Sequence, residues 1–183
     1  MHWLAPPKMA VSLLLAALAA LALVGINEAG YRQSSRALAD IEEAQQVRGT
    51  LNQILQNMLD AETGQRGYLL TGETNYRQPY DTAVKEVDGN LATLRRLYAG
   101  RPAELNQLTE LSKHVLRKVA EMDMSVRLRQ DGKEDAWKFV ITTDVGREEM
   151  DSIRATAGEL VRISNDTLHQ SQAQVLKSLQ LAR

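Results

Sequence analysis

The sequence contains no cysteine, few aromatic residues and no excess of either charge. Without cysteine, the chain has no disulfide framework, no thiolate metal site and no cysteine nucleophile. Aromatic residues make up 4% of the chain, and it has only 4 prolines and 11 glycines, a composition that disfavours a β-sandwich or barrel. The net charge of −1 gives no bulk attraction to nucleic acid, so we expect no nucleic-acid partner. A length of 183 residues has room for one ordinary domain.

Histidine is also scarce, with only His2, His114 and His169 in the chain. None of the three lies in a metal-binding spacing, and catalysis needs several convergent groups. We therefore expect no enzyme activity, no metal and no cofactor. One alternative remains: the stretch from His114 to Lys118 loosely resembles the motif of histidine phosphotransfer domains, which are themselves four-helix bundles.

One long hydrophobic run stands near the N-terminus. Residues Met9–Ile26 (MAVSLLLAALAALALVGI) carry no charge over 18 residues, the lower working length for a membrane-spanning helix. We interpret the run as a membrane span. Two alternatives are a cleaved signal peptide, with Lys8 before the run and Ala20-Leu21-Ala22 as the cleavage site, and a buried soluble helix.

This interpretation divides the chain into three parts. Residues 1–8 are expected in the cytoplasm, 9–26 in the membrane as a single span, and 27–183 outside the cytoplasm. The charges beside the run do not fix the orientation, since long domains translocate largely regardless of charge. The expected location is the bacterial inner membrane, with the folded domain on the periplasmic side.

Beyond residue 27 the apolar residues recur at helical spacings almost everywhere. Turn signals at Gly72, at Gly100 with Pro102, and at Asp131-Gly132 separate the helical stretches. We predict an all-α fold, a four-helix up-down bundle whose long N-terminal helix is continuous with the transmembrane span. The predicted core stripes are Leu38, Ile41, Leu51, Leu55, Met58, Leu69; Tyr80, Val84, Val87, Leu91, Leu94, Tyr98; Leu105, Leu108, Leu111, Val115, Val119, Met122, Val126; and Met150, Ile153, Ala157, Leu160, Ile163.

Polar residues interrupt the first of these stripes. Glu62 and Gln65 occupy positions where leucine would be expected. A buried carboxylate costs several kcal/mol unless it is paired, so these residues need partners. The favoured interpretation is an interhelical polar network that includes Arg66, with Asp151 or Arg154 as partners on the last helix. The other interpretation is the floor of a ligand pocket.

The same residues carry a family resemblance. The stretch DAETGQRGYLLTGETNYRQPY, from Asp60 to Tyr80, resembles the signature of the third type of CHASE domain (cyclases/histidine kinases associated sensory extracellular). Residues Gly146–Arg154 resemble the second conserved stretch of that family, and the similarity covers about residues 41–163. The signature and network positions that follow are Asp60, Glu62, Thr63, Gly64, Gln65, Arg66, Gly67, Tyr68, Gly72, Pro79, Tyr80, Met150, Asp151 and Arg154.

The resemblance implies an extracytoplasmic helical sensor domain of bacterial signal transduction, in a two-component or cyclic-nucleotide system. Binding of a ligand or partner would displace helices and reach a cytoplasmic histidine kinase, cyclase or chemoreceptor output, which we expect to be absent from this chain. A homodimer and a signalling partner protein are further expectations. The alternative from a different class is a single-span structural adaptor that binds another envelope protein.

Overall fold

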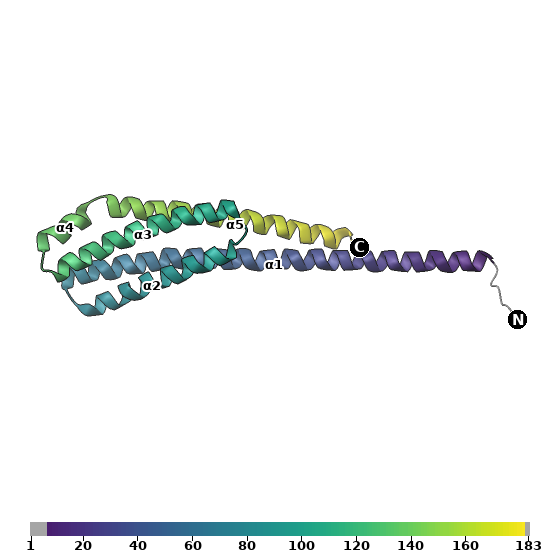
Figure 1. Ribbon diagram of the computed structural model, residues 1–183, viewed down its shortest axis with the longest axis horizontal. Coiled ribbons are helices and arrows are strands. Elements are labelled where there is room, and N and C mark those ends of the chain that lie inside the picture. Colours follow the sequence, from purple (N-terminus) through teal and green to yellow (C-terminus); the bar gives the residue numbers. More distant parts are fainter. Residues whose placement is uncertain (1–6, 182–183) are drawn as a thin grey trace. The chain divides into compact units, whose positions relative to one another are not determined.

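The computed structural model describes the backbone of residues 7–181 and the side-chain surroundings of residues 11–173 and 176. The described residues fold into helices joined by short turns (Figure 1). The helices are α1 (Pro7–Thr71), α2 (Thr74–Leu97), α3 (Pro102–Gln130), α4 (Glu134–Thr142) and α5 (Val145–Leu181). The all-α class and the long N-terminal helix are confirmed.

The predicted number of helices is wrong by one. The segment expected as a short apolar piece before the last helix is a separate helix, α4, of 9 residues. Glu134 and Asp135 in its first turn favour a helix start, because acidic side chains interact well with the helix dipole there. Trp137 is its one buried residue. Indole burial therefore holds this short helix, which would be marginal alone.

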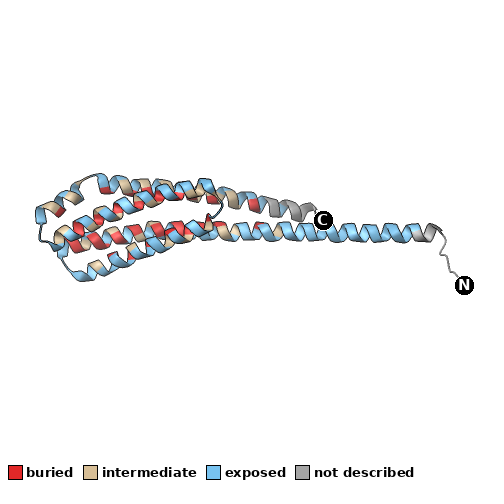
Figure 2. Ribbon diagram, viewed as in Figure 1, coloured by how far each residue is buried: buried red, intermediate tan, exposed pale blue. Residues whose placement is uncertain are grey.

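The chain divides into two compact units. The larger unit, Glu43–Thr167, is an up-down bundle of the C-terminal part of α1 with α2, α3 and the N-terminal part of α5, and α4 lies at one end of it. Buried residues recur along each of these helices (Figure 2). Ser164 of α5 donates a hydrogen bond of 2.9 Å to the Ala44 carbonyl of α1. Packing of apolar stripes, with a few buried polar contacts, therefore holds the bundle.

The core stripe of α1 repeats at alternating steps of three and four residues, the spacing of left-handed helix packing. At two positions the observed stripe differs from the predicted one by a single residue. Ile54 and Ala61 are fully buried, whereas the predicted Leu55 and Glu62 are only partly buried. The buried positions are Val47, Leu51, Ile54, Met58, Ala61, Gln65, Tyr68 and Leu69.

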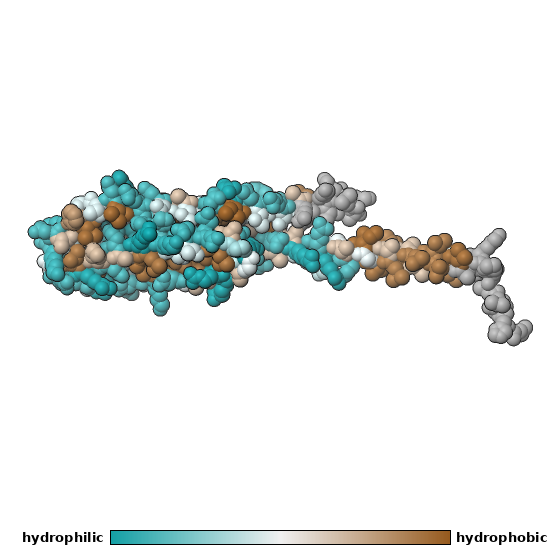
Figure 3. Space-filling model, turned by 45° about the horizontal axis from the view of Figure 1, so that its top comes forward, coloured by the Kyte–Doolittle hydropathy of each residue, from teal (hydrophilic) through white to brown (hydrophobic). Residues whose placement is uncertain are grey.

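The second unit comprises the chain up to Glu42 and from Leu168. In α1, none of the most apolar 18-residue window is buried, and its mean hydropathy is 2.0. Figure 3 shows this hydrophobic surface along the N-terminal part of α1. Among the described residues, α1 is the one helix long and apolar enough to cross a membrane, a criterion that signal sequences also meet. Leu38, predicted in the core, is 59% exposed, and Ala37 is buried instead.

Residues 1–6, most of the segment predicted to lie in the cytoplasm, are outside the described residues. The predicted turns at Gly100 with Pro102 and at Asp131-Gly132 are confirmed. At the end of α1, Gly72 adopts a φ of +75° and its N–H donates to the Tyr68 carbonyl at 2.8 Å. Glycine suits this left-handed helix cap because it has no Cβ to clash.

Candidate functional site

Polar side chains link α3 to the three other long helices of the bundle. We call this set the polar belt. It consists of His114, Lys118, Glu121, Asp123 and Ser125 on α3 with Glu62 and Gln65 on α1, Tyr80 on α2 and Glu149 on α5.

The deepest contact of the polar belt joins α1 to α3. Gln65 is 2% exposed, and its side-chain amide donates a 2.6 Å hydrogen bond to the Ser125 hydroxyl. Ser125 is fully buried and donates in turn to the Met122 carbonyl at 2.7 Å. A buried amide without a partner would cost free energy, so this chain of hydrogen bonds fixes the register of α1 against α3.

A buried lysine lies two turns before Ser125 on α3. Lys118 is 3% exposed, and its ammonium group lies 2.8 Å from the Glu121 carboxylate and 3.4 Å from that of Glu62. Glu62 also pairs with the exposed Arg66 at 2.9 Å. Two cations and two carboxylates therefore balance, and a buried charge is tolerated when it is paired in this way.

Glycines make room for this arrangement. A Cβ on Gly64 of α1 would lie 2.9 Å from the Tyr76 carbonyl oxygen and 3.1 Å from the Tyr80 amide nitrogen of α2, and a Cβ on Gly67 would overlap the Tyr76 ring. A Cβ on Gly146 of α5 would lie 2.7 Å from the Glu121 carboxylate. Gly64, Gly67 and Gly146 thus permit close approach between helices.

Two further contacts extend the polar belt to α2 and α5. The buried Tyr80 hydroxyl donates to the Asp123 carboxylate at 2.6 Å, and burial followed by this hydrogen bond raises the tyrosine pKa well above its usual value. His114 Nδ1 lies 2.6 Å from the Glu149 carboxylate, with Arg117 at 3.6 Å from the other carboxylate oxygen. Relative movement of α2 or α5 against α3 would strain these contacts.

The structure places several other predicted site residues away from the polar belt. Asp151 and Arg154, expected as network partners, pair with each other at 2.8 Å on the exposed face of α5. Met150 is buried in the core. The residues that replace them, Lys118 and Ser125, were not among the predicted site residues.

A signal for the missed residues is present in the sequence. The buried positions of α3 step by three and four residues in alternation. Lys118 and Ser125 fall on this repeat, whereas the predicted stripe contained their neighbours Val119 and Val126. A strict heptad count over the whole helix would have found both.

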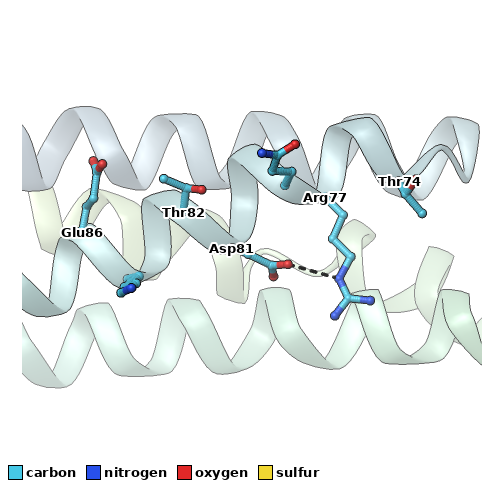
Figure 4. Close-up of a pocket in the computed structure, with 7 residues that line it drawn as sticks. Thr74, Arg77, Asp81, Thr82 and Glu86 are labelled. Carbon is cyan, nitrogen blue, oxygen red and sulfur yellow. Dashed lines mark ion pairs between the residues drawn. The ribbon is translucent and has the colours of Figure 1, made fainter.

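The surface of α2 carries a shallow groove. All of its lining residues lie on α2, including Arg77 and Asp81, which pair at 3.5 Å (Figure 4). A neighbouring groove between α1 and α2 is lined in part by Asp60, Thr63 and Pro79. These signature residues therefore face outward, and Asp60 accepts a hydrogen bond of 2.9 Å from Gln56. Within the described part of the chain, no group of three or more histidine, aspartate or glutamate side chains is arranged to hold a metal ion.

Comparison with known families decides the relationship. The CHASE3 domain model matches residues 37–174. The chain belongs to the CHASE3 domain family. The resemblance inferred from the signature is thereby confirmed, and this match includes the expected signature region.

A solved structure agrees in fold. The crystal structure of the Rhodopseudomonas palustris histidine kinase HK9 sensor domain is similar to this CHASE3 chain with a TM-score of 0.65 and 24% sequence identity. The similarity covers 69% of this chain and 98% of that domain. No curated protein sequence matches the chain. A CHASE3 sensor domain by itself is not catalytic.

Proposed function

We propose that this CHASE3 chain is the membrane-anchored, extracytoplasmic sensory part of a bacterial receptor. In this proposal residues 1–8 lie in the cytoplasm, 9–26 span the inner membrane once, and 27–183 form the exported sensory region. Binding of a ligand or partner would be relayed by helix displacement to a cytoplasmic output of histidine kinase, cyclase or chemoreceptor type. Family membership supports the sensory role, and the apolar run supports the anchor.

One observation carries the relay mechanism. A single helix, α1, contains both the apolar run and the signature residues Glu62 and Gln65. These two residues make the polar contacts of α1 with α3, and α3 in turn contacts α2 and α5 through Tyr80 and Glu149. A ligand that prefers one packing of these helices would therefore shift α1, by biasing an equilibrium between packings.

Breaking α1 between the apolar run and the bundle tests this relay. In a receptor in which the chain is joined to a kinase output, Gly30→Pro should abolish control of the kinase, because proline in a helix interior costs about 3 kcal/mol and kinks the helix. Gly30→Ala is the matched control, since a Cβ there meets nothing within 4 Å. Kinase output that is the same in both variants would contradict a rigid relay.

Homodimerisation remains part of the proposal. Leu116 and Met124 on α3 are 61% and 57% exposed, so the bundle has apolar surface that a second copy could cover. Because the chain has no cysteine, single cysteines at these positions would report proximity of two copies without background. Disulfide crosslinking at neither position would argue against a dimer through α3.

A further inference from the structure

Trp137 on α4 is the one buried tryptophan that the structure describes, and its polar atom has no partner. Its side chain is 4% exposed, and the indole Nε1 is buried without a hydrogen bond among the described residues. An indole N–H is a donor only, and buried donors in folded proteins are nearly always satisfied. The site is therefore short of one hydrogen-bond acceptor.

Basic side chains surround this indole. The Arg129 guanidinium lies 5.6 Å from the ring centroid and the Lys138 ammonium 5.7 Å from it, both within cation–π range. Lys138 also pairs with Glu134 at 2.7 Å. The Arg129 side chain, by contrast, forms no hydrogen bond or ion pair with any residue that the structure describes, although its charge contributes to lowering the pKa of Glu134.

The Arg129 guanidinium also lies close to the turn between α1 and α2. A Cβ on Gly72 would lie 3.3 Å from a guanidinium nitrogen of Arg129. The guanidinium thus lies between the α1–α2 turn and the Trp137 ring, with its N–H donors unused. Guanidinium and carboxylate groups match in geometry, and the pairing is strong when it is shielded from water.

We propose that Trp137 and Arg129 form a binding site for a small carboxylate at this end of the bundle. The acceptor oxygens of one carboxylate would satisfy the indole N–H and the guanidinium together. The charge favours a monoanion, because Lys138 is already paired and Arg129 supplies a single uncompensated positive charge. The inference rests on the proposed sensory function only in giving that sensor a ligand class.

The connection between α4 and α5 would allow such a ligand to displace α5. Trp137 is the one buried residue of α4, so a ligand bound at its indole acts on the residue that holds this helix on the bundle. Thr143 and Asp144 are the only residues between α4 and α5. A carboxylate that draws α4 toward Arg129 would therefore pull on the start of α5, which carries Glu149 of the polar belt.

Tryptophan fluorescence tests the site in the full chain held in detergent micelles. The chain has 2 tryptophans, so Trp3→Phe leaves Trp137 as the sole emitter. Sodium acetate, titrated against sodium chloride at constant ionic strength, should change the emission with saturation. Arg129→Gln should weaken acetate binding about tenfold or more, as expected for loss of a charged hydrogen bond. Arg127→Gln is the matched control, because Arg127 is an exposed arginine in the same turn of α3.

Thermal unfolding is a second measurement, which also applies to variants without the indole N–H. Acetate should raise the thermal midpoint of the parent chain, by preferential binding to the folded state, and should not raise that of Trp137→Phe. No saturable response to acetate, an equal loss in both arginine variants, or a response to inorganic phosphate alone would each overturn the proposal. All of these measurements are independent of membrane insertion and of any kinase output, so their failure leaves the proposed function standing.

Discussion

The two ends of α1 distribute their hydrophobic side chains in different ways. From Val11 to Ile26 the aliphatic side chains lie on every side of the helix, and Leu18 and Ile26 are 55% and 71% exposed. In the bundle the apolar residues of the same helix follow one stripe, and Leu51 and Ile54 are fully buried. A helix that is hydrophobic all round requires apolar surroundings on all sides, whereas a stripe requires only a packed face. The difference indicates two environments for one helix.

The largest expected loss of stability comes from a substitution in the polar belt, a feature that the apolar end of α1 lacks. Lys118→Met should destabilise the bundle by about 3 kcal/mol or more, because it leaves the Glu62 and Glu121 carboxylates without their buried cation. Urea unfolding followed by circular dichroism would measure the change. Lys113→Met is the control, since that lysine is exposed and pairs with Glu110 on the surface, and its loss should change the free energy of unfolding little. Equal effects in the two variants would show that the buried cation has no special role.

Truncation of aliphatic side chains compares the two ends of α1 directly. Ile54→Ala should lower the free energy of unfolding by about 2–4 kcal/mol, because it removes a fully buried side chain and leaves a cavity. Leu18→Ala should leave unfolding of the bundle unchanged. The comparison fails if urea unfolding of the chain in micelles shows a similar loss for both.

The glycines of α1 and α2 should respond with opposite signs. Gly64→Ala should cost about 1–3 kcal/mol, since its Cβ meets α2 backbone that cannot move without shifting the helix. Gly89→Ala should stabilise the bundle by about 0.5–1 kcal/mol, because alanine is the better helix former and a Cβ there meets nothing within 4 Å. Thermal melting of the two variants checks this prediction, and destabilisation by both substitutions would contradict it.

A smaller effect should come from Tyr80. Tyr80→Phe should cost about 1 kcal/mol through loss of the hydrogen bond to Asp123. The pKa of Tyr80 is raised in the folded chain, and burial raises that of Tyr98 to about 12. Above about pH 10 tyrosines in the unfolded chain ionise while these two do not, so stability is present below that pH and falls above it. Between pH 10 and 12 the parent should lose more stability than Tyr80→Phe, and parallel losses would contradict the assignment.

Much of the fold could be predicted because local signals and packing agree. The turns at Gly100 with Pro102 and at Gly132 follow from backbone chemistry, and most stripe residues, such as Leu94 and Ile153, are buried as predicted. The helical spacing of apolar residues predicted the wrong buried residue where two neighbours are both apolar: Leu38 is exposed and Ala37 is buried. It also failed for α4, whose existence depends on burial of a single indole against α3.

The polar belt could be predicted in part. Gln65 stood out because it interrupts an apolar stripe, but its partner Ser125 lies 60 residues away on a helix whose own stripe already seemed complete. Small hydroxyl residues are common on helix surfaces, so residue type alone does not separate a buried serine from an exposed one. Helix pairing in three dimensions makes that distinction.

The most direct test of the account is the topology of α1. In a chain without cysteine, one cysteine is introduced either in place of Lys8, before the apolar run, or in place of Asp88, an exposed residue of α2. A membrane-impermeant maleimide applied to intact spheroplasts should label the cysteine at 88 and spare the one at 8, with both labelled after lysis. A cysteine at 88 that is protected until lysis would contradict an extracytoplasmic bundle anchored by α1.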